Sequence, residues 1–237
     1  EMCHRRGAVR LRKLCFANRG VYLKAGQHIA IMDYVLPQAY VDEMQKCFDA
    51  CPRSSPSDVE AVIREELSAS PGQLFATFDP EPIASASLAQ VHRATLQDGT
   101  VAAVKVQHRM LQQTWRAEVA GIEGVLKVVR WFQPTFGFEW LADEVRENLP
   151  KELDFRLEAA NAARCRRILA EGGFGDAVAV PQTHPELTTP RVLVMDFEEG
   201  QSLLATPSEI RAGGIEPGAI ARRLAELQCE MAFVHGF

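Results

Sequence analysis

The spacing of apolar residues along the chain predicts several amphipathic helices. In these stretches apolar side chains recur at three- and four-residue steps, which places them on one face of a helix. Proline and glycine pairs, Pro71-Gly72 and Gly172-Gly173, are expected to end the helices that precede them. The predicted helices are Leu11–Met32, Val41–Phe48, one that is capped by Ser57 or Asp58 and runs through Leu67, Met110–Phe132, Phe138–Leu169 with a bend or restart near Pro150, and Pro217–Val234.

Two shorter runs have the composition of paired strands. Pro82–His92 and Val101–Gln107 flank Asp98-Gly99, a dipeptide that favours a tight hairpin turn. The small side chains of Ala84–Ser87 predict a loop ahead of the first strand, where the backbone can approach a ligand. A β-hairpin between two helical regions is therefore expected.

Further strand signals lie on either side of this hairpin. Phe75 and Phe78 are expected to contact the core just before it. Val178–Val180 and Arg191–Phe197 are predicted as two strands around a loop, and the continuous apolar run within the second indicates a buried strand. Helices alternating with these strands indicate an α+β fold with an antiparallel sheet.

A lysine inside the hairpin is the first candidate for chemistry. Lys105 lies in a run of valine and alanine, where an ammonium group is costly unless it meets an anion. A loop of small residues, a strand, a turn and a strand with one lysine form the phosphate clamp of a kinase small lobe. The residues alone also allow a simpler interpretation, in which Lys105 extends to solvent and Glu158 is an unpaired surface acid.

Composition and charge narrow the class of protein. The chain has 237 residues, of which 47% are hydrophobic and 24% charged, as in ordinary globular domains. Its net charge of −5 gives no general nucleic-acid footprint, so no nucleic-acid partner is expected. Basic residues nevertheless dominate residues 1–24, either as the exposed face of a helix or as a surface that approaches an acidic membrane or partner. No transmembrane helix is expected, because the most apolar candidate, Val21–Val41, is interrupted by charges and a proline.

The cysteines indicate reduced thiols in a reducing compartment rather than a disulfide framework. No pair has C-x-x-C spacing and no nearby histidines complete a zinc set, so no metal site is expected from them. Cys47 and Cys51 would lie one turn apart on a helix. The six cysteines are Cys3, Cys15, Cys47, Cys51, Cys165 and Cys229.

An ordered set of motifs resembles the UbiB/ADCK (aarF-domain-containing kinase) family of atypical protein-kinase-like proteins. The motifs follow the family's order and cover nearly the whole chain. They are Lys24-Ala25-Gly26-Gln27, Ile83 to His92, Val104-Lys105-Val106-Gln107, Glu152-Leu153-Asp154-Phe155 with Glu158 and Asn161, and Val192 to Phe197.

The resemblance implies a protein-kinase-like small lobe, an antiparallel sheet with helices, behind a helical N-terminal extension and followed by only the start of the large lobe. The extension with the Lys-x-Gly-Gln motif is expected at residues 1–70. The small lobe with inserted helices and hinge is expected at 71–200, and the start of the large lobe at 201–237. An exposed apolar stripe is expected on the last predicted helix, because most of that lobe would be missing.

The same resemblance assigns roles to residues near the nucleotide. Lys105 resembles the strand lysine that meets the α- and β-phosphates, and Glu158 the helix glutamate that pairs with it. Ala84, Ser85, Ala86 and Ser87 resemble the alanine-rich loop that replaces the glycine-rich loop of protein kinases. Ser85 stands where the family commonly has alanine, a small departure. Met195, Asp196, Phe197 and Glu198 resemble the hinge, whose backbone would hydrogen-bond adenine.

Further residues resemble the family's own regulatory extension. Lys24 and Gln27 resemble its helix over the active site, and Glu152 and Asp154 the acids that hold it. On one continuous helix, Asp154 and Glu158 would share a face and Glu152 would be turned away. An extension held over the cleft in this way would exclude a protein substrate, which in the family accompanies ATPase or small-molecule phosphoryl chemistry.

The implied cofactor is ATP or ADP with Mg²⁺, but the family's magnesium ligands are not found in these residues. No Asp-Phe-Gly and no His-x-Asp sequence occurs. We therefore expect that residues 1–237 alone do not catalyse phosphoryl transfer at a useful rate, whether they are a fragment of a longer enzyme or a truncated product.

Two hypotheses about function follow. The first is an ATP-binding kinase-like enzyme or ATPase, which by resemblance acts in ubiquinone and lipid homeostasis in mitochondria, with the plastid as the alternative. Protein partners in a quinone-biosynthesis complex and a peripheral membrane or lipid contact are implied. The second is a non-catalytic, pseudokinase-like scaffold that binds partners or membrane through its N-terminal helices.

Overall fold

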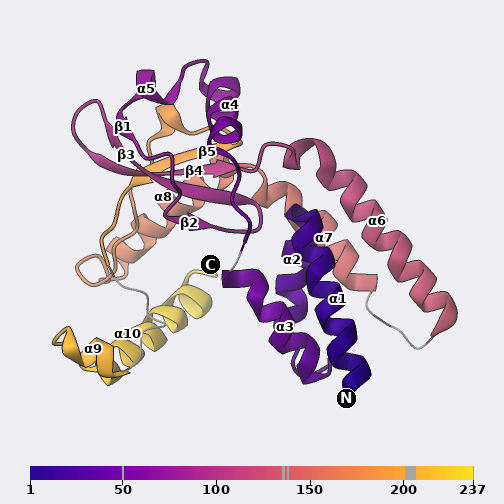
Figure 1. Ribbon diagram of the computed structural model, residues 1–237. Coiled ribbons are helices and arrows are strands. Elements are labelled where there is room, and N and C mark those ends of the chain that lie inside the picture. Colours follow the sequence, from indigo (N-terminus) through magenta and orange to yellow (C-terminus); the bar gives the residue numbers. More distant parts are fainter. Residues whose placement is uncertain (50, 135–136, 138, 201–206, 237) are drawn as a thin grey trace.

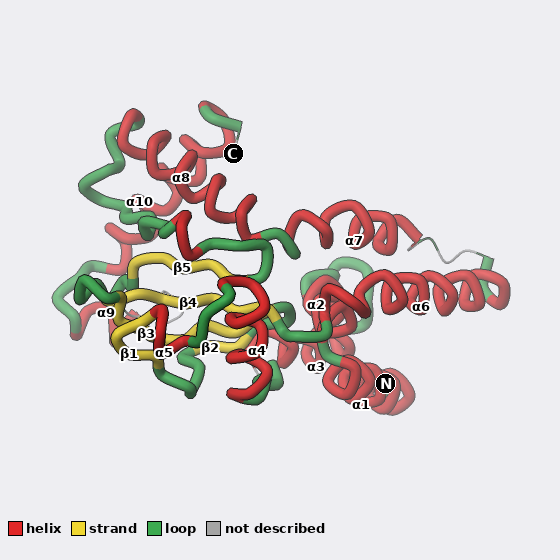
Figure 2. Tube along the Cα trace, turned by 90° about the horizontal axis from the view of Figure 1, so that it is seen from above, coloured by secondary structure: helices red, strands yellow, loops and turns green. Residues whose placement is uncertain are grey.

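The computed structural model describes residues 1–49, 51–134, 137, 139–200 and 207–236. Helices of the N-terminal part lie beside a sheet that is covered by further helices (Figures 1 and 2). The fold is α+β, with a five-stranded sheet whose described strand pairs are all antiparallel.

The N-terminal part contains α1 (Met2–Asn18), α2 (Gly20–Ala30) and α3 (Gln38–Asp49). The prediction of one helix over residues 11–32 is wrong, because the helical conformation is interrupted at Arg19. Arg19 has φ 61° and Gly20 has φ 46°, a left-handed conformation that cannot continue a right-handed helix. A Cβ on Gly20 would also lie 3.1 Å from both a Glu118 oxygen and a Leu111 methyl, so α6 (Leu111–Phe132) packs closely against this break.

Two helices lead into the sheet, α4 (Pro56–Leu67) and α5 (Pro71–Leu74). The cap of α4 is Ser55, not Ser57 or Asp58: its side chain accepts the Asp58 N–H, and Pro56 follows as the first helical residue. Pro71-Gly72 also does not end α4, which stops at Ser68 in a left-handed conformation. The proline instead begins α5, because a helix tolerates proline in its first turn.

The sheet has the order β1-β3-β4-β5, and β2 pairs with the start of β3. Its central hairpin joins β3 to β4 around Gly99, whose φ of 92° suits the predicted turn. Residues 178–180 lie in a loop rather than in the predicted strand. The segment that follows them pairs with β5 at an isolated bridge, Thr183–Met195. The strands are β1 (Phe75–Phe78), β2 (Ala84–Ser85), β3 (Ala89–Leu96), β4 (Val101–Gln107) and β5 (Val192–Asp196).

Both faces of the sheet are covered, and alternation along β4 decides which side chain meets which helix. Val104 and Val106 face α4, in a core that also contains Phe75 and strand residues of β5. Lys105 lies between them and faces the opposite side, where Phe155, the first residue of α8 (Phe155–Glu171), packs. Figure 1 shows α4 above the sheet and α8 below it.

Three helices connect β4 to β5: α6 (Leu111–Phe132), α7 (Glu139–Glu152) and α8 (Phe155–Glu171). The predicted stretch 138–169 begins outside the described residues and divides at Leu153 and Asp154, while Pro150 lies inside α7. The predicted end of α8 at Gly172 is confirmed. A short 3₁₀ turn, Pro185–Leu187, precedes β5.

The C-terminal elements are α9 (Pro207–Ala212), α10 (Pro217–Cys229) and a π-helical turn, Glu230–Val234. Residue 201, where the start of a large lobe was expected, lies outside the described residues. Phe233 and Val234 of the π-helical turn are 86% and 65% exposed, and Leu224 on α10 is 37% exposed.

Candidate functional site

Lys105 and Glu158 form an ion pair on the α8 side of the sheet. Lys105 Nζ lies 2.7 Å from Glu158 Oε1 and 2.8 Å from Oε2, so it donates to both carboxylate oxygens. The same ammonium lies 4.7 Å from the ring centroid of Phe155, whose face stabilises a cation. The lysine side chain remains 25% exposed, so the cation is fixed in place yet open to a further anion.

The sequence fixes this pair through a buried glutamine at the end of β4. Gln107 is 2% exposed, and its amide nitrogen donates to Leu153 O at 2.8 Å and to Pro190 O at 2.9 Å. These two carbonyls mark the junction between α7 and α8 and the approach to β5. Phe155 N–H also donates to Pro190 O, so the first turn of α8, which carries Glu158, is held beside β4.

The small residues 84–87 form a tight turn rather than an open loop. Ala84 and Ser85 pair with β3 as β2, and Ala86 N–H donates to Ala89 O at 2.8 Å. Ser87 is 5% exposed. Hydrogen bonds therefore hold the turn in place. Val91 pairs with Ala84 on one side and is the direct cross-strand neighbour of Lys105 on the other.

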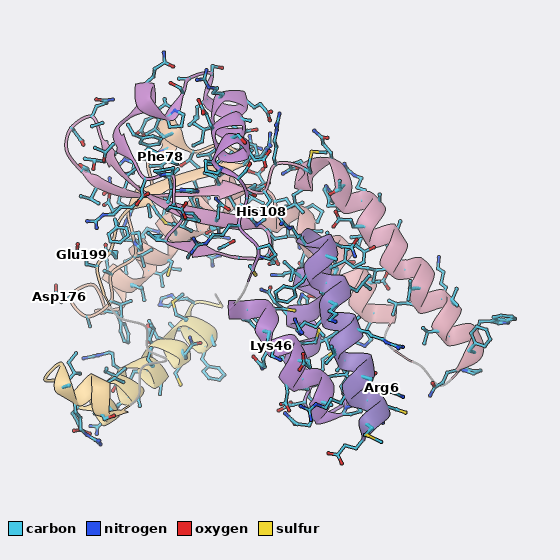
Figure 3. All side chains as sticks on the ribbon, viewed as in Figure 1. Arg6, Lys46, Phe78, His108, Asp176 and Glu199 are labelled. Atoms are coloured by element: carbon cyan, nitrogen blue, oxygen red, sulfur yellow. The ribbon has the colours of Figure 1, made fainter. Side chains whose placement is uncertain are left out.

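Two histidines near this turn, the half-buried His108 and the buried His92, were not identified as site residues from the sequence. His108 Nε2 lies 3.0 Å from Ala86 O, and its Nδ1 lies 2.7 Å from Ser54 Oγ. Because a carbonyl only accepts, Nε2 carries the proton and Nδ1 accepts from the Ser54 hydroxyl. Burial lowers the pKa of His108 below its usual value, which favours this neutral form. His108 lies where the sheet meets the N-terminal helices (Figure 3).

The second histidine continues the same network into the sheet. Ser54 N–H donates to Gln90 Oε1 at 2.7 Å, and the Gln90 amide donates to His92 Nε2 at 2.9 Å. His92 Nδ1–H donates to Asp79 O at 2.8 Å, and burial lowers its pKa. The sequence offered one signal for this network: Gln90 and His92 are polar residues inside a predicted strand. Buried polar groups need hydrogen-bond partners, so such residues indicate a network.

The N-terminal part reaches this site through α2. Lys24 Nζ lies 2.7 Å from Glu152 Oε2 at the end of α7. Gln27, one turn further on, donates to Cys47 O at 3.0 Å and accepts the Ser87 hydroxyl at 3.2 Å. The helix that carries the Lys-x-Gly-Gln motif is thus tied both to α7 and to the turn of small residues.

Asp154 does not join Lys24, in contrast to the sequence-based expectation. It is the N-cap of α8, where its carboxylate accepts Arg156 N–H and pairs with the Arg156 side chain at 2.7 Å. The Arg156 hydrogen bond lowers the pKa of Asp154. The reason is that the helix is interrupted between Glu152 and Phe155. Glu152 is the last residue of α7 and Asp154 is the N-cap of α8, so the spacing rule for one continuous helix does not apply.

The residues expected to form a hinge follow the end of β5. Phe197 N–H donates to Val101 O at 3.0 Å and Asp196 N–H donates to Gln182 O at 2.8 Å. The Asp196 carboxylate lies 2.9 Å from His184 Nε2. Met195 pairs with Ala103 inside the sheet. The backbone N–H groups of Asp196 and Phe197 are therefore engaged within the protein, and Met195 is held in the sheet.

The donor set suits an anionic nucleotide better than a metal ion. A fixed, partly exposed ammonium and a turn of small side chains match phosphate groups. Among the described residues there is no group of three or more His, Cys, Asp or Glu that could hold a metal. The arrangement can therefore present a fixed, partly exposed cation to an anionic ligand.

Comparison with known proteins places this geometry in context. A family model described as the ABC1 atypical kinase-like domain matches residues 46–237. AarF domain-containing protein kinase 1 of Gallus gallus is 42% identical over 234 residues, which cover 99% of this chain and 44% of that protein. The probable serine/threonine-protein kinase abkD of Dictyostelium discoideum is 35% identical over 237 residues, covering 100% of this chain and 34% of that protein. The chain thus spans less than half the length of these relatives.

A solved structure shows the same fold. The Rv3197 protein of Mycobacterium tuberculosis, in a complex with erythromycin, is 26% identical and superposes with a TM-score of 0.52. The similarity covers 89% of this chain and 52% of the Rv3197 chain. Hence the arrangement of sheet and helices described above recurs in a distant relative.

Proposed function

The chain belongs to the ABC1 atypical kinase-like family, and we propose that residues 1–237 form the nucleotide-holding part of an atypical kinase-like phosphotransferase or ATPase. The ligand is ATP or ADP. Lys105 contacts the phosphates, the turn at Ala84–Ser87 lies over them, and the segment Met195–Glu198 faces the adenine ring. Bound Mg²⁺ supplies neutralisation of phosphate charge, and its ligands lie outside the residue set described above.

The ion pair between Lys105 and Glu158 carries the proposal. A lysine in a sheet between two buried faces is costly without an anion, and here the anion comes from a helix that is far along the chain. Gln107 and Phe155 fix the geometry from both sides. Such a fixed cation, still partly exposed, is the arrangement that a phosphate group completes.

The contacts of α2 with α7 and with the turn of small residues support a small-molecule substrate or water, rather than a protein, as the phosphoryl acceptor. Lys24–Glu152 and Gln27–Ser87 hold the N-terminal helices against α7 and against the turn of small residues. Helices held at that edge leave little room for a folded protein. We therefore propose ATP hydrolysis or phosphoryl transfer to a small molecule rather than to a protein.

The physiological setting is proposed from family resemblance alone. It comprises ubiquinone and lipid homeostasis, protein partners in a quinone-biosynthesis complex, and the mitochondrion, with the plastid as the alternative. Among the described residues no helix is long and apolar enough to cross a membrane. The phosphoryl-transfer step itself needs the aspartates and asparagine that the family places in its large lobe, so these activities belong to the whole protein.

Calorimetric titration of the chain with ADP and with ATP tests nucleotide binding directly. We expect Lys105→Met to weaken binding about 10- to 100-fold, because a charged hydrogen bond to phosphate contributes about 1.5–3 kcal/mol. Glu158→Gln is expected to weaken binding less, since the ammonium remains. Lys127→Met, which removes an exposed lysine from α6, is the matched control and should bind like the parent chain.

Equal affinities for Lys105→Met and the parent chain would overturn the proposed role of Lys105. If the correctly folded parent binds neither nucleotide, the nucleotide proposal fails as a whole. The remaining hypothesis is then the non-catalytic scaffold, whose function does not need Lys105.

A further inference from the structure

The end of the α6–α7 hairpin exposes a cluster of large apolar side chains. On α6, Val125, Val128, Trp131 and Phe132 are 63%, 56%, 78% and 76% exposed. Trp140, at the start of α7, is 50% exposed. We call these five side chains the hairpin tip. Single exposed apolar residues are ordinary on protein surfaces, but five at one end of a hairpin form a patch that indicates a partner.

The tip is set apart from the part of α6 that contributes to the core. Leu111, Trp115 and Val119 are buried against α2 and α7 in the first half of the helix. Val125, Val128 and Phe132 follow at three- and four-residue steps and form a second stripe that points to solvent. Part of the apolar surface of α6 is therefore not buried by the rest of the described structure.

The position of the tip suits a flat surface rather than a groove in another protein. Both views show α6 extending away from the sheet, so that its far end projects from the body of the molecule (Figures 1 and 2). The Trp131 and Phe132 rings pack with their centroids 4.7 Å apart, which gives the projecting end a compact aromatic face. Tryptophan favours the boundary between lipid headgroups and acyl chains, because its ring is apolar and its N–H is polar.

A basic surface accompanies the tip. Helix α1 carries the exposed side chains of Arg5, Arg6, Arg10 and Lys13. The N-terminal end of α1 and the C-terminal end of α6 both point away from the sheet (Figure 1), and Arg6 lies near that end of α1 (Figure 3). Basic side chains at the same end of the molecule as an aromatic cluster complement the negative charge of an acidic bilayer.

From these observations we propose that the hairpin tip inserts into the interface of an anionic lipid bilayer while α1 contacts the headgroups. This contact is independent of nucleotide binding and of Lys105.

Vesicle co-sedimentation of the chain tests the proposal, with vesicles of phosphatidylcholine alone and of phosphatidylcholine mixed with phosphatidylserine. We expect binding to the mixed vesicles. Trp131→Ala with Phe132→Ala should lower the partition coefficient about tenfold or more, because two large side chains lose their burial in lipid. The matched control is Phe233→Ala with Val234→Ala, which removes equally exposed side chains from the π-helical turn and should bind like the parent.

The contribution of the basic residues of α1 and the insertion of the tip into the bilayer are measured in separate experiments. Arg5→Gln with Arg6→Gln should weaken binding to the acidic vesicles about fivefold for each charge removed. Vesicles with brominated acyl chains should quench Trp131 and Trp140, but not Trp115, which is 9% exposed in the core. These are the chain's three tryptophans, so in Trp131→Phe with Trp140→Phe the remaining fluorescence reports Trp115 alone and should not be quenched.

Unchanged sedimentation of the Trp131→Ala, Phe132→Ala variant would overturn the proposal, as would equal quenching of the double Phe variant and the parent. A third contrary result is a dimer in sedimentation velocity that the same variant abolishes, with no vesicle binding by the parent. That result would identify the occupant of the tip as a second copy of the chain.

Discussion

The hydroxyl of Ser87 donates to Oε1 of Gln27 across 3.2 Å, and so joins the turn of small residues to helix α2. The two residues are far apart in the sequence, and the hydrogen bond forms because α2 packs beside the start of β3. The other end of the Gln27 side chain donates to Cys47 O in α3. One glutamine therefore connects three segments around the candidate nucleotide site.

The first prediction concerns this connection. Gln27→Ala removes the acceptor of the Ser87 hydroxyl and one of the two side-chain donors to Cys47 O, the other being the Cys51 thiol. The loss of these two hydrogen bonds should lower the free energy of unfolding by about 1–3 kcal/mol. Urea denaturation measures this change. Gln38→Ala, which removes an exposed Gln38–Asp42 hydrogen bond, is the control and should change stability by less than about 0.5 kcal/mol. Equal losses in the two variants would contradict a connecting role for Gln27.

The second prediction concerns Gly26, whose missing side chain makes room for a thiol. A Cβ at this position would lie 2.8 Å from Cys47 Sγ. Gly26→Ala should therefore destabilise the chain by about 1–3 kcal/mol, measured by thermal or urea unfolding. Adding Cys47→Ala should recover part of that loss, because the clashing sulfur is removed.

Gly124→Ala serves as the matched control for Gly26→Ala. Gly124 lies within α6, and a Cβ there meets nothing within 4 Å. Alanine should stabilise that exposed helical position by about 0.5–1 kcal/mol. Destabilisation of the same size at both glycines would show that close packing is not what requires Gly26.

A third prediction follows from Gln107 as the residue that positions α8. Gln107→Leu removes two buried hydrogen bonds, to the Leu153 and Pro190 carbonyls, and should cost about 1–3 kcal/mol of unfolding free energy. The two carbonyls keep one other donor each, the Gln112 amide and Phe155 N–H. Because Glu158 lies in the first turn of α8, amide hydrogen exchange should also increase at the start of that helix. Gln97→Leu, at an exposed position, is the control. Loss of stability without faster exchange at α8 would argue against positioning.

The fourth prediction is a dependence of stability on pH. Burial lowers the pKa of both His92 and His108 below the usual 6.5, so the unfolded chain binds protons that the folded chain excludes. Stability should therefore be constant with respect to these groups above about pH 7.5 and should fall as the pH drops below about 6.5. Urea midpoints across this range test it, and His108→Gln should show a shallower fall than the parent.

A fifth prediction concerns thiol reactivity. None of the six cysteines is in a disulfide, and Cys3 and Cys229 are exposed while Cys15 and Cys47 are buried. The Cys15 thiol shares a hydrogen bond with Cys47, which raises the pKa of Cys15 and lowers that of Cys47. Iodoacetamide should label Cys3 and Cys229 first in the folded chain, and peptide mass spectrometry should show labelling of Cys15 and Cys47 only after denaturant is added.

Periodicity predicted most of the elements, because a helix or strand that buries one face has to repeat its apolar residues at the matching step. The Asp98-Gly99 hairpin, α6 and the end of α8 at Gly172 follow from such local signals. The break at Arg19 and the cap at Ser55 were missed. Both depend on packing or on side-chain hydrogen bonds that a periodic pattern does not record.

The assignment of acids around α8 shows the same limit. A spacing argument put Asp154 and Glu158 on one helical face, but the helix begins only after Asp154. Glu152, the residue that spacing turned away, is the one that meets Lys24. The roles proposed for these residues in nucleotide binding remain predictions.

The sequence by itself determined the family, the α+β class and the presence of a lysine in a buried strand, because these depend on local pattern and on ordered motifs. The resemblance also assigned Glu158 to Lys105, and the two form the ion pair. Only the tertiary structure decided which of the two acids, Glu152 or Asp154, meets Lys24, which carbonyls Gln107 and His108 hold, and which apolar residues of α6 remain at the surface. Each of these contacts joins segments that are distant in the sequence. Their geometry is set by how whole helices and strands pack, and no local pattern contains that information.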